Sequence, residues 1–245
     1  MDSFFNMLYK SNKNKEYYKI FPFQWEKIQG VEYSINEEPI NVKVFLDKVY
    51  LLFKEANSLL IIDNKNDDNI VNISLDNYPC DMYLSEKREE IYISSFLGEC
   101  ISIIDCREGM VKSKIREISY PSKILLSKDE KVLFISEHYE NTNGEIAFYS
   151  LEDNKIINRV EVGSFPYDLI EDEGYLYVSS IGDGTISIID LNNILEVLKI
   201  NACGIGGRIN KEGEKIYINN IIDDLQYEFN LSNKEIRKIS CIRGI

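Results

Sequence analysis

Several residue types are scarce in this chain of 245 residues, and each scarcity narrows the range of functions. It has one histidine, five prolines, one tryptophan and five cysteines without a Cys-x-x-Cys pair. A single histidine excludes sites built on paired histidines and gives a Ser-His-Asp triad no obvious basis. The odd cysteine count argues against a disulfide or zinc framework and favours buried or free thiols in a reducing, cytoplasmic environment.

Long apolar runs and excess positive charge are also missing. No stretch approaches about 18 consecutive apolar residues, so no membrane span is expected. The first residues lack the basic and then apolar pattern of a secretory signal. The net charge is −13, and without a basic stripe this charge disfavours nucleic-acid binding. The abundance of Ile, Asn, Lys and Glu is typical of an AT-rich bacterial genome.

What the chain has in abundance is self-similarity, at a spacing of about 40 residues. The two clearest copies, at 78–105 and 165–191, combine Pro-x-Asp, a Tyr-x-Ser-Ser strand and an Ile-rich strand that ends in Asp. Five units begin near residues 38, 78, 120, 164 and 202. The residues that open them are Pro39, Pro79, Pro121, Pro166 and Gly206. Since each unit needs neighbours to bury its faces, residues 38–245 are expected to form one domain.

Each unit contains four short stretches rich in Ile, Val, Tyr and Phe, separated by Gly, Asn, Asp and Ser. No stretch from 38 to 245 keeps a helical period for more than about ten residues. Four antiparallel strands per unit, repeated radially, predict an all-β fold: a β-propeller of about five four-stranded blades.

The motifs resemble a known family. Pro-x-Asp, then Tyr-Val-Ser-Ser, then Thr-Ile-Ser-Ile-Ile-Asp is similar to the YVTN-type (lactonase-like) β-propeller repeat. The resemblance spans residues 38 to 240 and is strongest in the units at 78 and 164. It implies a fold far more than an activity, because members include surface proteins, lactonase-like proteins and many of unassigned role.

Residues 1–37 differ from the repeats. They contain two strand candidates, 17–23 and 27–35, and nine of the 28 aromatic residues. They predict an arm or half-blade that closes the seam of the ring, or an incomplete sixth blade whose free edge favours self-association or a partner strand. Because aromatic side chains are enriched at interfaces, the candidate partner-binding residues are Phe4, Phe5, Tyr9 and Trp25. The alternative is that these rings cover the seam.

Alignment of the units places one polar residue of each at the same point of its first strand. The set, which would line the mouth of the central channel, is Asn41, Asp81, Lys123, Asp168 and Arg208. Such a mixed ring could bind a small zwitterionic or carboxylate ligand, or neutralise itself as a structural plug. Asp81 and Asp168 could also hold a divalent metal for lactonase-like hydrolysis or lyase chemistry, although Lys123 and Arg208 would repel it.

Two further features have a structural and a functional interpretation. Asp63, Asp105 and Asp190 recur at the ends of third strands, where a carboxylate is expected to cap the following turn rather than bind a metal. His138 lies in the long loop 137–144, which we expect to be exposed and polar. Glu137 and Glu140 could join it in a metal site, but one His and two Glu make a weak zinc site.

From the sequence we assign no catalytic residue, no metal and no cofactor. It predicts a cytoplasmic, non-enzymatic scaffold or binding module that recognises a protein partner or a small ligand through its face loops or channel mouth. Two alternatives stay open: a lactonase-like hydrolase or lyase that uses the channel carboxylates, and a structural component that assembles through its N-terminal edge.

Overall fold

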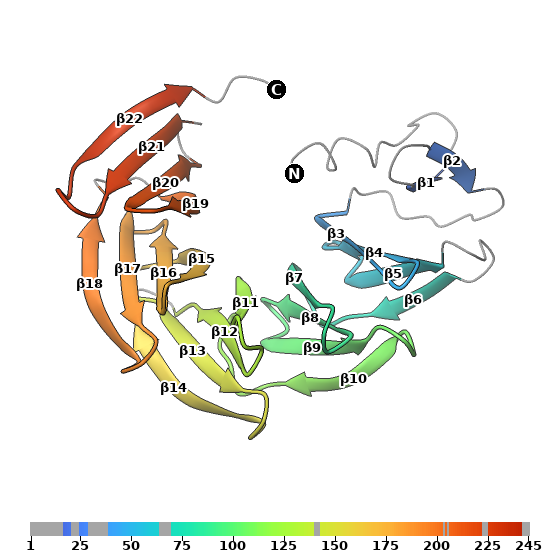
Figure 1. Ribbon diagram of the computed structural model, residues 1–245. Helices are drawn as coiled ribbons and strands as arrows, with labels where there is room; N and C mark the ends of the chain where they lie inside the picture. Colours follow the sequence, from blue (N-terminus) through green and yellow to red (C-terminus); the bar gives the residue numbers. More distant parts are fainter. Residues whose placement is uncertain are drawn as a thin grey trace.

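The computed structural model of the chain is a β-propeller whose five blades follow an open arc (Figure 1). Each blade is a four-stranded antiparallel sheet whose strands pair in chain order. The structure describes residues 17–20, 25–28, 39–63, 70–139, 143–202, 204, 206–221 and 225–241. The expected all-β propeller with about five blades is confirmed.

The blades follow one another along the chain, and each begins with its innermost strand. Blade 1 consists of β3 (Asn41–Phe45), β4 (Lys48–Phe53), β5 (Ser58–Asp63) and β6 (Ile70–Ser74). Blade 2 consists of β7 (Pro79–Ser85), β8 (Glu90–Ser95), β9 (Cys100–Asp105) and β10 (Met110–Ile115). Blade 3 consists of β11 (Ile124–Leu126), β12 (Val132–Glu137), β13 (Glu145–Ser150) and β14 (Lys155–Glu161). Blade 4 consists of β15 (Pro166–Asp172), β16 (Tyr175–Ser180), β17 (Thr185–Asp190) and β18 (Leu195–Asn201). Blade 5 consists of β19 (Gly207–Glu212), β20 (Lys215–Asn220), β21 (Leu225–Asn230) and β22 (Ile236–Cys241).

Blades stack because their middle strands are apolar on both faces. Alternate side chains of a strand emerge on opposite faces of the sheet. In β8, Ile91 and Ile93 belong to the buried cluster shared with blade 1, whereas Tyr92 belongs to the cluster shared with blade 3. Four such clusters lie between consecutive blades. The second and third strands are therefore nearly continuous apolar runs.

In blades 2 to 5 the recurring residue at the end of the third strand caps the next turn, as expected. The Asp105 carboxylate accepts the N–H groups of Arg107 at 2.8 Å and Glu108 at 2.9 Å. In blade 4, Asp190 accepts the N–H of Asn192 at 2.8 Å. These bonds satisfy backbone donors in a tight turn and leave no reason to assign these carboxylates to a metal.

The N-terminal part is described only in part. β1 (Tyr17–Ile20) pairs with β2 (Trp25–Ile28), at the start of each stretch predicted as a strand or just before it. Phe4, Phe5 and Tyr9 lie outside the described residues, and so does the side chain of Trp25. Their role in partner binding, and a boundary after residue 37, remain predictions. The described part of the chain contains no helix long and apolar enough to cross a membrane.

Replacing Ile93 tests the packing between blades. Ile93 is fully buried between blades 1 and 2, so Ile93→Ala leaves a cavity and should lower the free energy of unfolding by about 3 kcal/mol. Val197 in β18 is 49% exposed, and Val197→Ala should change it by less than about 0.5 kcal/mol. Urea unfolding followed by circular dichroism gives both values. Equal losses would contradict the assignment of Ile93 to the packed interface.

Candidate functional site

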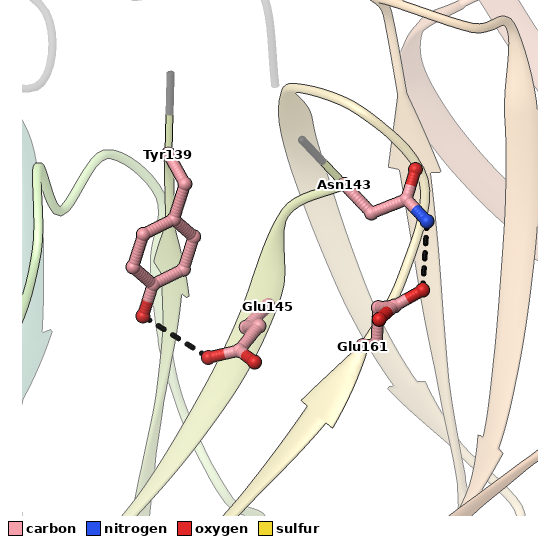
Figure 2. Close-up of a pocket in the computed structure, with 4 residues that line it drawn as sticks. All are labelled: Tyr139, Asn143, Glu145 and Glu161. Carbon is pink, nitrogen blue, oxygen red and sulfur yellow. Dashed lines mark hydrogen bonds between the residues drawn. The ribbon is translucent and has the colours of Figure 1, made fainter. Parts of the chain in front are cut away.

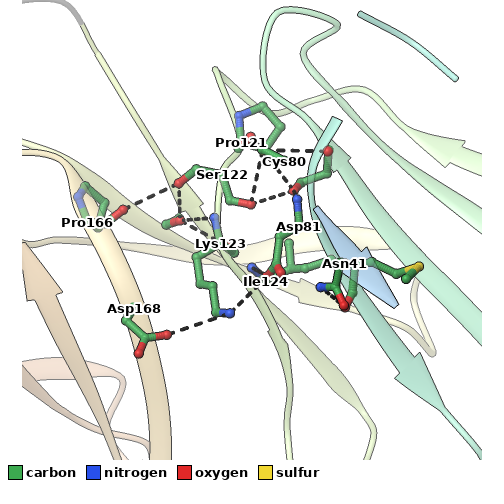
Figure 3. A network of polar contacts seen from close by, with 12 residues as sticks. Asn41, Cys80, Asp81, Pro121, Ser122, Lys123, Ile124, Pro166 and Asp168 are labelled. Carbon is green, nitrogen blue, oxygen red and sulfur yellow. Dashed lines mark hydrogen bonds and ion pairs between the residues drawn. The ribbon is translucent and has the colours of Figure 1, made fainter. Parts of the chain in front are cut away.

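Three of the five predicted channel residues meet around one ammonium group. Lys123 Nζ lies 3.3 Å from Asp81 Oδ2 and 3.7 Å from Asp168 Oδ1 (Figure 3). The two carboxylate side chains are only 14% and 15% exposed, and that of Lys123 is 34% exposed. A single cation directly before β11 thus joins the first strands of blades 2 and 4 through an acid on each side.

Each of the two carboxylates also accepts a backbone N–H of the next blade, from the residue that follows the aligned position. Asp81 Oδ2 accepts the N–H of Ile124 at 3.1 Å, and Asp168 Oδ2 accepts the N–H of Ile209 at 3.0 Å. Ile124 and Ile209 each follow the aligned position of the next blade. The Asp of Pro-x-Asp therefore connects neighbouring inner strands, which explains its recurrence without any ligand.

Asn41 and Arg208 occupy the two ends of the predicted set. The Asn41 side-chain amide donates to the Met82 carbonyl at 3.3 Å, so blade 1 is joined to blade 2 at the equivalent point. Arg208 is exposed on β19 and takes no part in the network that links the other described members of the set. The structure thus brings Asp81, Lys123 and Asp168 together, gives Asn41 a separate bond to blade 2 and leaves Arg208 apart.

The Tyr-x-Ser-Ser motif supplies a second connection between blades. Ser94 Oγ donates to the Ser122 carbonyl at 2.5 Å, and Ser179 Oγ donates to the Gly207 carbonyl at 2.6 Å. Ser122 and Gly207 both precede the aligned position of the following blade. The inner strands of blades 3 and 5 are therefore held on both sides of that position, once by an Asp and once by a Ser.

Burial sets the electrostatics of the channel network. Desolvation raises the pKa of Asp168, while Lys123 and the Ile209 N–H act in the opposite direction. Desolvation also lowers the pKa of Lys43. The charge of Lys123 lowers it further, whereas the charge of Asp81 raises it. Lys43 lies in β3 and was not among the residues predicted from the sequence. The described channel is thus a set of charges that compensate one another.

This arrangement disfavours the metal that the alternative lactonase-like hypothesis requires. The ammonium group of Lys123 occupies the position between Asp81 and Asp168 that a shared cation would need. Within the described ranges, no group of three or more His, Cys, Asp or Glu side chains is placed to bind a metal ion. The same holds for the alternative around Glu137, because its carboxylate accepts the Ser119 N–H at 2.8 Å and pairs with Arg159 at 2.7 Å.

Sequence reasoning missed a second feature, on the face that carries the channel mouth. Five rings form a chain of contacts there that we call the aromatic collar: Tyr78, Phe96, Tyr120, His138 and Phe165. Centroids are 6.2 Å apart for Tyr78–Phe96 and 5.4 Å for Phe96–Tyr120. They are 5.5 Å apart for Phe96–His138 and 5.4 Å for His138–Phe165. At one end, Lys54 Nζ lies 4.0 Å above the Tyr78 ring.

The collar follows the repeat. Tyr78, Tyr120 and Phe165 directly precede the prolines that open blades 2, 3 and 4. Their partners directly follow the second strand of the preceding blade, at the position of Lys54, Phe96 and His138. Every contact except Tyr78–Phe96, which lies within blade 2, therefore joins two blades. An aromatic residue before the repeat proline in three of five units is the signal in the sequence that could have found it.

The three residues before proline adopt a backbone conformation that bulky side chains rarely take. The φ angles of Tyr78, Tyr120 and Phe165 are +62°, +42° and +53°, in the left-handed region that favours glycine. Backbone hydrogen bonds hold two of them, from the Phe96 N–H to the Tyr78 carbonyl at 2.8 Å and from the Ile181 N–H to the Phe165 carbonyl at 3.0 Å. Strain of this kind, maintained by the surrounding structure, clusters at functional sites.

His138 does not lie in an exposed polar loop, contrary to expectation. It is 9% exposed, and its ring lies between Phe96 and Phe165. Its Nε2 lies 2.5 Å from Ser122 Oγ, while its Nδ1 has no hydrogen-bond partner in the described structure. Desolvation lowers its pKa to about 4. A neutral, buried histidine without an acid on Nδ1 is part of the collar's packing and lacks the orienting group of a catalytic dyad.

A shallow pocket of about 420 Å³ lies at the same end of blade 3. It is lined by Tyr139, Asn143, Glu145 and Glu161 (Figure 2). The Tyr139 hydroxyl donates to Glu145 at 3.0 Å, and the Asn143 amide donates to Glu161 at 2.7 Å. Burial and the nearby carboxylates raise the pKa of Tyr139 to about 12. Both carboxylates already accept a hydrogen bond within the pocket. We therefore favour the collar over this pocket as a binding surface.

Comparison with known proteins shows the fold but not the family. No family model matches the chain. Antigen Lp49 of Leptospira interrogans is 29% identical over 110 residues, which are 42% of this chain and 24% of that protein. The match thus spans about a quarter of the length of this curated relative.

Solved structures resemble the chain over most of its length. Kuenenia stuttgartiensis hydrazine synthase gives a TM-score of 0.68 at 12% identity, over 86% of this chain and 68% of its own. The dihydro-heme d1 dehydrogenase NirN in complex with DHE gives 0.59 at 13% identity, over 80% of this chain and 46% of its own. The fold they share is the β-propeller. At these identities the likeness carries no activity to this chain.

Lys123→Met tests the charge balance of the channel. At neutral pH the variant should lose about 1–2 kcal/mol of unfolding free energy, because two buried carboxylates lose their shared cation. Protonation of Asp168 relieves this repulsion in the folded state, which then binds more protons than the unfolded state. The variant's deficit should therefore shrink from about pH 7 to about pH 5, as measured by urea unfolding.

The matched control for this measurement is Lys128→Met. Lys128 Nζ lies 3.4 Å from Asp172, but its side chain is 63% exposed, and exposed ion pairs contribute little. The control should therefore change stability by less than about 0.5 kcal/mol at either pH. A deficit of Lys123→Met that is no larger, or that grows on acidification, would show that the channel charges do not compensate one another.

His138 predicts a second pH dependence. Its folded-state pKa of about 4 lies below the ordinary value of 6.5, so stability is complete above 6.5 and is lost as pH falls towards 4. Between about pH 7 and pH 5 this contributes a loss of about 2 kcal/mol. His138→Phe keeps a ring and should remove this part of the slope, measured by urea unfolding at both pH values. An unchanged slope would mean that His138 is accessible to protons when folded.

Proposed function

We propose that this protein is a non-enzymatic binding module that recognises a segment of a protein partner through its aromatic collar. The observation that carries the proposal is the chain of rings from Tyr78 to Phe165 on the loop face, with Phe165 51% exposed. Aromatic side chains on a preformed surface are typical of energetically important contacts at protein interfaces.

The collar is ordered before a partner arrives. Its rings contact one another across blade boundaries, and the inner strands beneath it are joined by the bonds of Asp81 and Asp168. Fewer side-chain conformations are then lost on binding, which favours affinity. Loops positioned by a rigid scaffold commonly carry recognition.

Charge and hydrophobicity define the partner's chemistry. Leu97, which follows Phe96 on the same face, is 52% exposed, and Ile221 at the equivalent loop of blade 5 is 46% exposed. The chain as a whole carries a net charge of −13. A partner segment with apolar side chains and basic flanking residues therefore fits best, since cations are attracted both by the net charge and by aromatic faces.

The channel residues support a structural role better than a ligand site. A small zwitterion or carboxylate would have to displace Lys123 from Asp81 and Asp168, and the metal-dependent hydrolase or lyase would require the same displacement. For these reasons we favour the collar over the channel as the site of recognition.

A cytoplasmic setting agrees with the thiols that the structure describes. Cys80, Cys100 and Cys106 are free, and burial raises the pKa of each to about 11. Such thiols are largely protonated at neutral pH and react slowly. They behave as small apolar side chains and need no oxidising compartment.

Site-specific photo-crosslinking tests the proposed function. A photoreactive phenylalanine analogue at position 165, in the full chain expressed in its own cells, should capture one predominant protein after irradiation. The same analogue at Val197, which is 49% exposed on the rim strand β18, serves as the control position. The adduct at 165 should be absent at 197.

A second substitution tests whether the collar is the surface that binds the captured protein. With the analogue kept at 165, Phe96→Ser should weaken capture severalfold, whereas Val197→Ser should not. Capture of the same proteins from both positions, or capture that ignores Phe96→Ser, would contradict recognition by the collar. Circular dichroism of each variant establishes that the fold is kept.

A further inference from the structure

The two faces at the ends of the arc differ in character. On the side of blade 1 away from blade 2, β4 and β5 present a fully apolar, buried cluster, here named the blade 1 end face. Its members, 1% to 6% exposed, are Val49, Leu51, Phe53, Leu60 and Ile62. Partly buried Val42 and Ile70 pack beside them. All of these residues come from blade 1 itself, so no other described blade covers the cluster.

Blade 5 ends differently. In blade 4, the register pairs on the face toward blade 5 are Tyr177–Ile188 and Ser179–Ile186. The same registers of blade 5 hold Tyr217–Glu228 and Asn219–Gln226. The apolar residues of the third strand are thus replaced by a charged and an amide side chain, on the face that points away from blade 4.

The polar groups of this blade 5 end face are satisfied within the blade. The Gln226 amide donates to Asn219 Oδ1 at 3.0 Å. Glu228 pairs with Lys215 at 3.0 Å and with Arg237 at 2.8 Å. A repeat whose outer face is polar is the usual way to end an array of repeats in water.

The two end faces are poor partners for each other. Closure of the ring between blades 5 and 1 would press the Glu228 ion pairs against Leu51 and Leu60, and an apolar surface offers no hydrogen bonds in return. Figure 1 shows the arc open between these two blades. The blade 1 end face therefore needs a different cover.

We propose that the ring stays open and that this chain's own residues 1–37 cover the blade 1 end face. The segment directly precedes blade 1 and holds nine of the 28 aromatic residues. Its two described strands pair with each other, and Figure 1 places this hairpin beyond blade 1, on the side away from blade 2. An aromatic segment on an apolar sheet face supplies the burial that a sixth blade would give. This inference concerns a different surface from the collar and does not depend on it.

The chain's one tryptophan, Trp25, reports on this cover. In the folded full chain its emission should be shifted to the blue, and acrylamide should quench it severalfold less than in the urea-unfolded chain. Leu51→Ala, which opens a cavity in the blade 1 end face, should raise the quenching of Trp25 toward the value of the unfolded chain. Tyr217→Ala, on the blade 5 end face, should leave it unchanged.

Quenching of Trp25 in the wild type tests the proposal by itself, even if Leu51→Ala fails to fold. In that case Ile62→Val, which removes one methyl group from the same cluster, replaces it. A Trp25 that is as accessible in the folded chain as in the unfolded one would overturn the proposal. So would equal responses to Leu51→Ala and Tyr217→Ala. Protection that disappears on dilution would also overturn it, because the segment would then cover a second copy.

Discussion

Side chains on the inner strands of this propeller hydrogen-bond to the backbone of the next blade, and the rest of the structure depends on that connection. Asp81, Asp168 and Asn41 bond backbone groups 41 to 43 residues away, which is the length of the repeat. The apolar clusters between blades add the larger part of the stabilisation, because the second and third strands bury side chains on both faces. The length of the repeat is thus the sequence separation between two groups that hydrogen-bond across a blade boundary.

The same constraint produces the surface that we assign to recognition. The prolines fix where each inner strand begins, and the aromatic residue before three of them is turned onto the loop of the preceding blade. Most contacts that form the collar therefore also join neighbouring blades. The collar is stabilised by the fold, while the outer side of Phe165 stays open to solvent.

The sequence predicted most of the fold because strands, turns and repeats have local signatures. The five units, the second and third strands and the capping role of Asp105 and Asp190 all follow from residue type and spacing. The alignment of the repeats placed Asp81, Lys123 and Asp168 at equivalent positions, and the structure brings these three together. The alignment did not show that Arg208 stays apart, in the unit where Gly206 replaces the proline. The burial of His138 was not predictable from its polar neighbours, since Phe96 and Phe165 come from other blades. Ring closure is likewise a property of two faces that are far apart in the chain.

Selection of peptides from a random display library against the folded protein tests the central claim most directly. The account predicts enriched peptides with apolar and basic residues that bind the wild type and Val197→Glu alike but lose binding to Phe165→Glu. Peptides that bind Phe165→Glu as well as the wild type, or that respond equally to both substitutions, would contradict recognition by the aromatic collar.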